Sequence, residues 1–169
     1  MMATFTRSHA IISSCGRYRY TLTRGWSAGT AMAFVMLNPS TADAMIDDPT
    51  IRRCISFARR EGHGTLHVVN LFAIRSPSPA AIIREADPVG PDNLRHIAAT
   101  IDASQEVVVA WGAHPLAERQ EQVVMKFITD YGHTPKCLGL TKNDHPRHPL
   151  YVRADAPLIP FPIRRDAQC

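Results

Sequence analysis

The sequence contains no long hydrophobic run. Its longest apolar stretch, residues 31–37, is far shorter than the roughly 20 residues that a membrane-spanning helix needs. The N-terminal segment shows neither a long apolar region nor a small-residue cleavage site, so we expect no secretory signal and a cytoplasmic protein. With 169 residues, 45% of them hydrophobic and 20% charged, the chain has the size and composition of one globular domain.

Cysteine and lysine are both scarce. The four cysteines are far apart and form no C-x-x-C pair, which argues against a zinc or iron–sulfur site, so we expect reduced thiols and no metal. Only three of the 19 basic residues are lysine, and the formal net charge is +4. The planar fork of arginine suits phosphates and bases, but a high-GC genome also enriches arginine. The arginine excess therefore leaves nucleic-acid binding and a compositional bias equally open.

Three common enzyme motifs are absent as well. The sequence has no G-x-S-x-G nucleophile elbow, no G-x-x-x-x-G-K-[ST] phosphate loop and no G-x-G-x-x-G dinucleotide fingerprint. No cofactor is therefore expected.

Short apolar runs alternate with amphipathic segments along the chain. An N-terminal edge strand or hairpin is predicted at residues 18–26, and buried strands are predicted at residues 31–37, 66–70, 106–111 and 136–140. Helices are predicted to begin at Pro49, Pro79, Pro91 and Pro115, the first of them ending at Gly62. This order predicts a three-layer α/β/α fold around a central, mainly parallel sheet of four strands.

The same pattern predicts how the chain is divided. Residues 1–30 are expected to form a strand or hairpin packed on the domain, and residues 31–152 the α/β domain itself. Residues 153–169 contain three prolines and are expected to form an extended tail over the body.

Polar residues gather where the predicted strands end. In an open parallel sheet, ligands bind beyond the carboxyl ends of the strands. At these ends the sequence places N-P-S-T-A-D at residues 38–43, N-L-F-A-I-R-S-P at 70–77, W-G at 111–112 and T-K-N-D-H-P-R-H-P-L at 141–150. We therefore expect the ligand site at this edge of the sheet.

Two asparagines stand at these strand ends. Asn38 precedes Pro39, which restricts it to an extended conformation; its amide either faces a ligand or satisfies its own turn. Asn70 closes an apolar strand, where its amide offers two donors and an acceptor to a base edge or stabilises the following loop.

Histidines and aspartates are the titratable candidates. His145 and His148 are favoured as hydrogen-bond donors to developing negative charge, with metal binding as the weaker alternative. Asp43, Asp47 and Asp48 are favoured as loop and helix-cap residues, with a metal site or a general base as the alternative.

Taken in order, the four strand ends resemble the motifs of the uracil-DNA glycosylase superfamily. M-L-N-P-S at residues 36–40 looks like its first motif, G-Q-D-P-Y or G-x-N-P. V-V-N-L-F-A-I-R at 68–75 is similar to its strand with a base-reading asparagine, and V-A-W-G at 109–112 to its L-L-W-G. H-P-R-H-P-L at 145–150 resembles its H-P-S-P-L with one additional residue. L-N-P-S-T-A-D at 37–43 is also similar to the signature of an uncharacterised bacterial and phage family.

The resemblance implies a DNA glycosylase that flips a nucleotide out of DNA and removes uracil or a 5-modified pyrimidine. It implies that Asn70 reads the base, that Asn38 positions the water attacking C1′, and that His145 or His148 stabilises the departing base. The residues it implies at the substrate are Pro39, Ser40, Asn70, Phe72 and Trp111. Those it implies at the DNA partner are Arg75, Lys142, Arg147 and Leu150, the last as the wedge that replaces the flipped base.

Three departures from the superfamily pattern change the expectation. Asn38 stands where efficient members have an aspartate general base, so turnover is expected to be slow. Met36 replaces a glycine that allows close approach of DNA. Ser40 replaces a bulky tyrosine, which predicts a pocket open to 5-substituted pyrimidines. Two other functions remain as alternatives: a non-catalytic protein that binds a flipped or single-stranded base, and an enzyme acting on free nucleosides or nucleotides.

Overall fold

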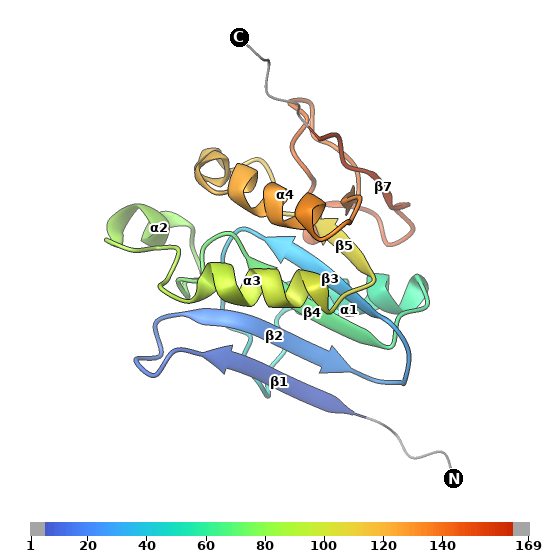
Figure 1. Cartoon of the computed structure of the whole chain (residues 1–169), viewed down its shortest axis with the longest axis horizontal. Helices are drawn as coiled ribbons and strands as arrows, with labels where there is room; N and C mark the ends of the chain where they lie inside the picture. The colour runs from blue at the N-terminus through green and yellow to red at the C-terminus, as the bar shows by residue number, and fades with distance from the viewer. Residues whose placement is uncertain (1–5, 164–169) are drawn as a thin grey trace.

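The computed structural model describes residues 6–163 and shows one seven-stranded sheet with helices on both faces (Figure 1). The strands are β1 (Arg7–Ile12), β2 (Arg19–Gly25), β3 (Ala31–Met36), β4 (Thr65–Asn70), β5 (Glu106–Val109), β6 (Lys136–Cys137) and β7 (Ile159–Pro160). The α-helices are α1 (Pro49–Arg60), α2 (Ala80–Arg84), α3 (Asn93–Asp102) and α4 (Glu121–Asp130), and the 3-10 helices are η1 (Pro115–Arg119) and η2 (Pro149–Tyr151).

The order of the strands across the sheet is β1-β2-β4-β3-β5-β6-β7. The pairs β3–β4, β3–β5 and β5–β6 are parallel, and the pairs β1–β2, β2–β4 and β6–β7 are antiparallel. The α/β class is therefore confirmed, but the predicted central sheet of four strands is too small, and the sheet is not mainly parallel as predicted. The N-terminal hairpin joins the sheet through β2, and the C-terminal segment adds β7 at the opposite edge, so parallel and antiparallel pairings are equal in number.

Two predicted elements differ from the observed ones. The strand expected over residues 136–140 is regular only in β6, the two residues Lys136 and Cys137. The helix expected from Pro115 divides into η1 and α4, because Gln120 between them has the non-helical angles φ −126° and ψ −18°. Helix α1 begins as predicted, with Asp48 as its N-cap and Pro49 in its first turn.

Two hydrophobic clusters lie on the two faces of the sheet. On one face α1 contributes Ile51, Cys54 and Phe57, which pack with Phe34 of β3 and Val68 of β4. On the other face, α3 and α4 cover the neighbouring strand residues, including Val35, Val69, Val107 and Val109. Consecutive residues of β3 and β4 therefore enter opposite clusters, as the alternation of side chains along a strand requires. These buried strands hold their carboxyl ends in fixed register, with Met36 opposite Asn70.

The C-terminal segment lies against the body of the domain as far as residue 163. Phe161 packs edge-on against Trp111, with ring centroids 5.8 Å apart, and its backbone N–H donates to the carbonyl of Pro135. Arg60 of α1 donates to the carbonyls of Ala154 and Ala156. The remainder of the predicted tail, residues 164–169, lies outside the described residues.

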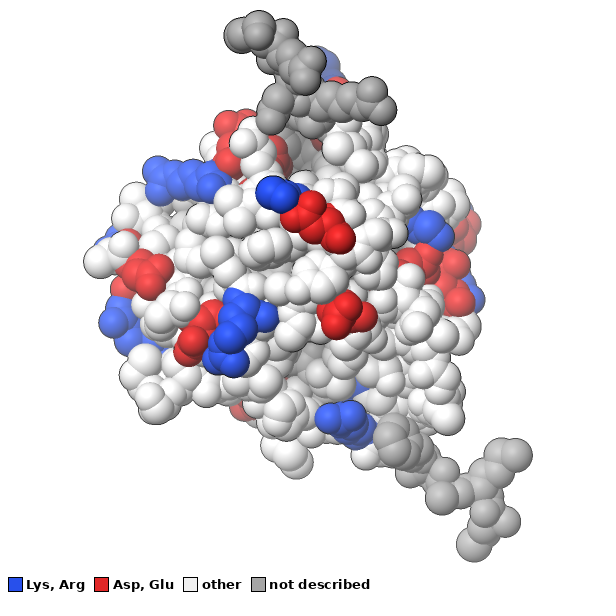
Figure 2. Space-filling model, in the orientation of Figure 1, with Lys and Arg blue, Asp and Glu red and all other residues white. Residues whose placement is uncertain are grey.

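Charged side chains of both signs are interspersed on the face that carries α3 and α4. Figure 2 shows basic and acidic groups next to one another there, with no continuous basic patch. The arginine excess of the sequence is therefore not concentrated on this face. Among residues 6–163, no helix is both long and apolar enough to cross a membrane.

Candidate functional site

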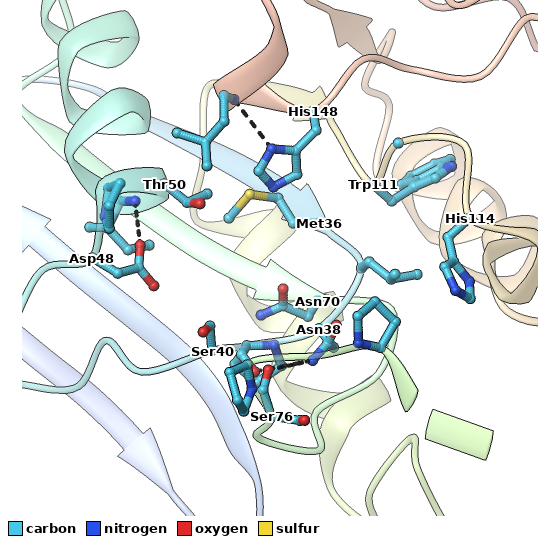
Figure 3. A pocket seen from close by; sticks show the side chains of 18 of the residues that line it. Met36, Asn38, Ser40, Asp48, Thr50, Asn70, Ser76, Trp111, His114 and His148 are labelled. Carbon is cyan, nitrogen blue, oxygen red and sulfur yellow. Dashed lines mark hydrogen bonds between the residues drawn. The ribbon is translucent and has the colours of Figure 1, made fainter. Parts of the chain in front are cut away.

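A pocket of about 690 Å³ lies at the carboxyl ends of β3, β4 and β5 (Figure 3). The segment after β3 and the first turn of α1 form part of its wall, and the loop that leads into η2 forms another. Since parallel strands end at the same edge of a sheet, the topology brings together residues that are far apart in the sequence.

Eight of the residues predicted at the substrate or DNA line this pocket. They are Asn38, Pro39, Ser40, Asn70, Trp111, Arg147, His148 and Leu150. The pocket is not lined by the other four predicted residues, which are His145, Phe72, Arg75 and Lys142.

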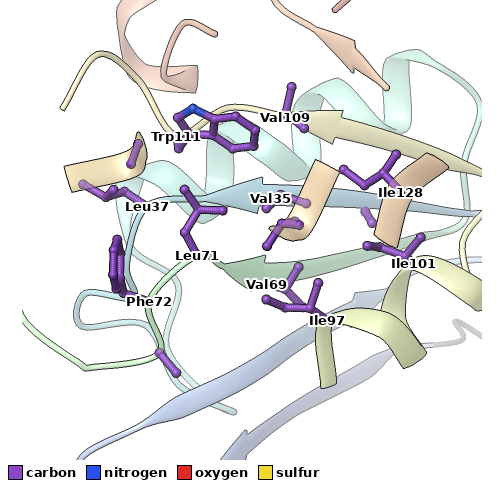
Figure 4. Packing of buried hydrophobic residues seen from close by; sticks show 14 of the residues in the cluster. Val35, Leu37, Val69, Leu71, Phe72, Ile97, Ile101, Val109, Trp111 and Ile128 are labelled. Carbon is purple, nitrogen blue, oxygen red and sulfur yellow. The ribbon is translucent and has the colours of Figure 1, made fainter. Parts of the chain in front are cut away.

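Three of these four residues are placed elsewhere by local contacts or burial, and Lys142 is exposed. His145 lies in a turn in which its carbonyl accepts from Thr141 N–H, and its side chain lines a second pocket instead. Phe72 is fully buried in the cluster beneath α3 and α4 (Figure 4). Arg75 donates to the carbonyl of Gly16 in the hairpin turn, and Lys142 is exposed. The structure thus brings His148, and not His145, to the pocket with the two asparagines.

Asn70 is the most unusual polar residue of this pocket. The residue is 1% exposed, and neither its Oδ1 nor its Nδ2 has a hydrogen-bond partner among the described residues. Its backbone is fixed, since Asn93 of α3 donates through Nδ2 to the Asn70 carbonyl at 2.9 Å. An unpaired buried amide costs folding free energy. A donor and an acceptor are therefore held side by side, ready for a planar ligand with the complementary pair.

Asn38 is oriented by its own amide nitrogen. Nδ2 donates to the carbonyl of Ser76 at 3.1 Å and to that of Pro39 at 3.2 Å. With both donors used by the backbone, Oδ1 is the atom of Asn38 that can serve a ligand, and it can only accept. This arrangement suits the orientation of a water molecule or of a hydroxyl group.

His148 has a defined tautomer. It is the N-cap of η2, and its Nδ1 accepts from the backbone N–H of Leu150 at 3.2 Å. In a neutral imidazole the proton must then be on Nε2. Burial lowers the pKa of His148, against an opposing effect of Asp48, so the neutral form is favoured at pH 7. His148 therefore offers an N–H donor without a full positive charge.

His114 is a pocket residue that the sequence analysis missed. It lines the same pocket and caps η1 as His148 caps η2, with Nδ1 accepting from the N–H of Leu116 at 3.3 Å. The sequence contains a signal for this residue, because the tripeptide H-P-L occurs at residues 114–116 and again at 148–150. Proline at the first helical position and histidine as the cap give both tripeptides the same local structure. The pocket is thus lined by two histidines with the same tautomer.

Arg19 is another pocket residue that was not predicted from the sequence, and a β-bulge in β2 determines its position. Tyr20 packs in the cluster on the α3 side, whereas Leu22 packs in the cluster on the α1 side, although residues two apart in a regular strand share a face. Neighbouring residues of β1 pair with Thr21 and Arg19, which marks a bulge in β2. Arg19 consequently reaches the α1 side, where its Nη1 donates to the carbonyl of Ala42 at 2.8 Å and its side chain lines the pocket.

The rim of the pocket is apolar. Leu150 and Tyr151 line it while remaining 44% and 78% exposed. Trp111 is buried deeper, and its Nε1 has no partner among the described residues. Gly112, at φ +79°, donates its N–H to the carbonyl of Pro146 and so ties the β5 exit to the loop before η2. The rim therefore combines exposed apolar groups with a fixed backbone.

The three aspartates after β3 have structural partners. Asp43 Oδ1 accepts from the N–H groups of Met45 and Ile46, which lowers the pKa of Asp43. Asp47 forms an ion pair with Arg24 at 2.8 Å, and Asp48 accepts from Ile51 N–H as the cap of α1. These contacts support the loop and cap interpretation. No group of three or more histidine, cysteine, aspartate or glutamate side chains in residues 6–163 is arranged to hold a metal ion.

Comparison with known proteins gives one match. Residues 19–150 match the family described as "Protein of unknown function (DUF1643)". The curated proteins and the solved structures contain no match to the chain. The matched segment begins at Arg19 and ends at Leu150, and it includes all four strand exits that form the pocket. Since it covers well over half of the sequence, the chain belongs to the DUF1643 family.

Proposed function

We propose that the protein is an N-glycosyl hydrolase of DNA glycosylase type, which takes a flipped pyrimidine nucleotide into the pocket at the strand ends. The observation that carries this proposal is the buried amide of Asn70, whose two polar atoms are unpaired within the described residues. The Watson–Crick edge of a pyrimidine presents a donor and an acceptor side by side, which match those two atoms. The resemblance of the strand-end motifs to uracil-DNA glycosylases supports the same assignment.

The other two polar residues suit hydrolysis at C1′. Asn38 Oδ1 accepts a hydrogen bond from water and orients it toward C1′, but an amide cannot act as a strong base, so the reaction is slow. As the C1′–N1 bond breaks, its electron pair stays with the base, and the Nε2–H of His148 donates to the base oxygen that gains charge. The water oxygen bonds to C1′, one water proton is released, and the base takes up a proton.

The surrounding surface suits an extruded nucleotide. Leu150 and Tyr151 expose apolar groups at the rim, as insertion into a base stack would require. Arg147 also lines the pocket, and its exposed side chain donates through Nε to the carbonyl of Leu140. The small Ser40 leaves room for a substituent on the pyrimidine ring.

The direct test is cleavage of modified DNA. Single- and double-stranded oligonucleotides containing uracil or 5-hydroxymethyluracil are incubated with the protein and then cleaved with alkali at abasic sites. We expect product with at least one base, and loss of product with retained binding in the Asn38→Ala variant. The matched control is Asn143→Ala, since Asn143 is an exposed residue of the loop before η2 that does not itself line the pocket.

Two results contradict the proposal. If no base gives abasic product but binding persists and weakens with salt, the protein binds nucleic acid without catalysis. If binding does not depend on salt, DNA is not its partner. Equal loss of cleavage and binding in Asn38→Ala assigns Asn38 a structural role.

A further inference from the structure

Arg19 brings a positive charge into the pocket that no acidic side chain neutralises directly. Its side chain is one of the largest buried side chains of the described residues, and the residue is 2% exposed. Within residues 6–163, no carboxylate oxygen lies within 4.0 Å of its guanidinium nitrogens. The proposed hydrolysis uses Asn38, Asn70 and His148 and gives Arg19 no part.

The guanidinium remains charged in this position. Burial lowers the pKa of Arg19 to about 10, and the negative charge of Asp48 is the strongest of the opposing effects. Even at that pKa the group is protonated at neutral pH. A buried cation without a hydrogen-bonded counter-ion is costly. Arg19 is therefore best satisfied when an anion enters the pocket.

The hydrogen bonds of Arg19 leave one edge of its fork unpaired. Nη1 donates to the carbonyl of Ala42, whereas Nε has no partner within the described chain. Oxyanions such as carboxylate and phosphate accept two parallel bonds from one guanidinium edge. The first turn of α1, residues 49–51, lines the same pocket, and the positive end of the helix dipole adds to the attraction for an anion.

We infer that the pocket contains an oxyanion subsite at Arg19, and that its ligand is a pyrimidine carrying a carboxylate or phosphate group. The pyrimidine part of this inference rests on the proposed function, whereas the oxyanion part rests on Arg19 alone. The phosphates of a DNA backbone remain at a protein surface. Arg19 is buried next to the segment that carries the small residues Ser40 and Ala42. The oxyanion must therefore belong to the group that enters the pocket. It is either a carboxylate on the pyrimidine ring or the phosphate of a mononucleotide.

Binding measured on two matched ligand pairs tests the subsite and distinguishes its sources. Isothermal titration calorimetry compares uracil with 5-carboxyuracil, and deoxyuridine with its 5′-monophosphate. We expect the anionic member of one pair to bind about tenfold more tightly than its neutral partner. Preference in the first pair identifies a ring carboxylate, and preference in the second a phosphate. Equal binding within both pairs overturns the inference.

Two variants locate the effect at Arg19. In Arg19→Gln, the preference for the anionic ligand is expected to disappear while binding of the neutral partner remains; a retained preference contradicts the inference. Asp48→Asn serves if Arg19→Gln does not fold, since asparagine is an equally good helix cap. Removing the Asp48 charge from the pocket should tighten anion binding about three- to tenfold and leave neutral ligands unaffected. No change in anion binding argues against a subsite in this pocket.

These measurements require no bond cleavage. Anion preference in a protein that cleaves no DNA leaves the subsite in place and removes the glycosylase proposal. Cleavage of DNA without any anion preference removes the subsite and leaves the glycosylase proposal in place.

Discussion

Two buried asparagines of the same region differ in the hydrogen bonding of their Nδ2, although the Oδ1 of each has no partner among the described residues. Asn93 donates through Nδ2 to the carbonyls of Asn70 and Leu71 at 2.9 and 3.3 Å. The Asn70 side chain, by contrast, makes no hydrogen bond within the described residues. Polar groups buried without partners cost free energy and are characteristic of ligand sites. If Asn70 serves an external ligand, the folded wild type should therefore be less stable than a variant with an apolar residue at this position.

Asn70→Leu is predicted to stabilise the protein by about 1 kcal/mol, because an apolar side chain of similar size has no desolvation cost to offset. Urea unfolding measures the difference, and the same variant should lose pyrimidine binding. Asn93→Leu is the matched control and should destabilise by about 1 to 3 kcal/mol, since two buried carbonyls lose their donor. A loss of stability in Asn70→Leu equal to that of Asn93→Leu would assign Asn70 to the structure of the loop.

His148 is predicted to make stability depend on pH. Burial lowers its pKa below 6.5, so the folded state binds fewer protons than the unfolded state as the pH falls. Its contribution to stability is thus present above pH 6.5 and is lost as the pH falls through the folded pKa. Burial also lowers the pKa values of His67 and His96, so they share the effect.

The His148→Asn variant isolates the contribution of His148 to this pH dependence, since asparagine keeps a cap for η2 but does not titrate. Its unfolding free energy, measured by urea titration from about pH 7 to about pH 5, should fall less than that of the wild type. An identical fall in both proteins would mean that folding does not change the pKa of His148.

The asparagines could be predicted from the sequence, but Arg19 could not. Asn38 and Asn70 directly follow or close apolar strand segments, and the carboxyl ends of parallel strands meet at one edge. The position of Arg19 depends on a bulge in β2, which no local pattern marks. Phe72 was misplaced because the chain after Asn70 continues to bond with the segment after β3, which turns Phe72 into the core.

At the scale of elements, two arginines of β2 hold the loop between β3 and α1. Arg24 of β2 is buried, and it pairs with Asp47 and donates to the carbonyls of Asp43 and Ile46. This loop carries Ser40 and the Ala42 carbonyl that binds Arg19. Arg19 and Arg24 therefore both hold the loop that forms this wall of the pocket.

Arg24→Leu is predicted to destabilise the protein by about 2 kcal/mol, because several loop carbonyls and one carboxylate lose their donor. Asp47→Asn should cost less than about 1 kcal/mol, since the Asp47 side chain is 31% exposed, so water screens the pair in part, and the carbonyl contacts of Arg24 remain. Thermal unfolding of the two variants gives the comparison. Equal losses would show that the ion pair, and not the carbonyl contacts, holds the loop.

Element boundaries were predicted best where a proline or a cap defines them. Asp48 and Pro49 fix the start of α1, and Pro115 fixes the start of η1. The break at Gln120 follows from its backbone conformation, for which the sequence offers no glycine or proline signal. The short β6 pairs with β7 over two residues and with β5 at one position, Val108 opposite Lys136.

At the scale of the whole molecule, the fold places one pocket where the polar strand exits meet. The N-terminal segment was predicted as a strand or hairpin packed on the domain, and its β2 pairs with β4 in antiparallel orientation, so the start of β2 lies toward the end of β4. The backbone N–H of Arg19 donates to the carbonyl of Ala73 after β4, and both Arg19 and Asn70 line the pocket. The antiparallel strand β2 thus adds a charged group, Arg19, to the site. In a purely parallel sheet, the site would consist only of residues at the strand ends.

The side-chain amide signal of Asn70 in a ¹⁵N–¹H spectrum tests the central claim most directly. The signal is identified by its absence in Asn70→Leu, and a uracil-containing single-stranded oligonucleotide is then added to the labelled wild type. We predict that the two Nδ2 protons of Asn70 shift as the protein saturates, while those of the exposed Asn143 do not. Saturation of the protein with an unchanged Asn70 signal would contradict base recognition in this pocket.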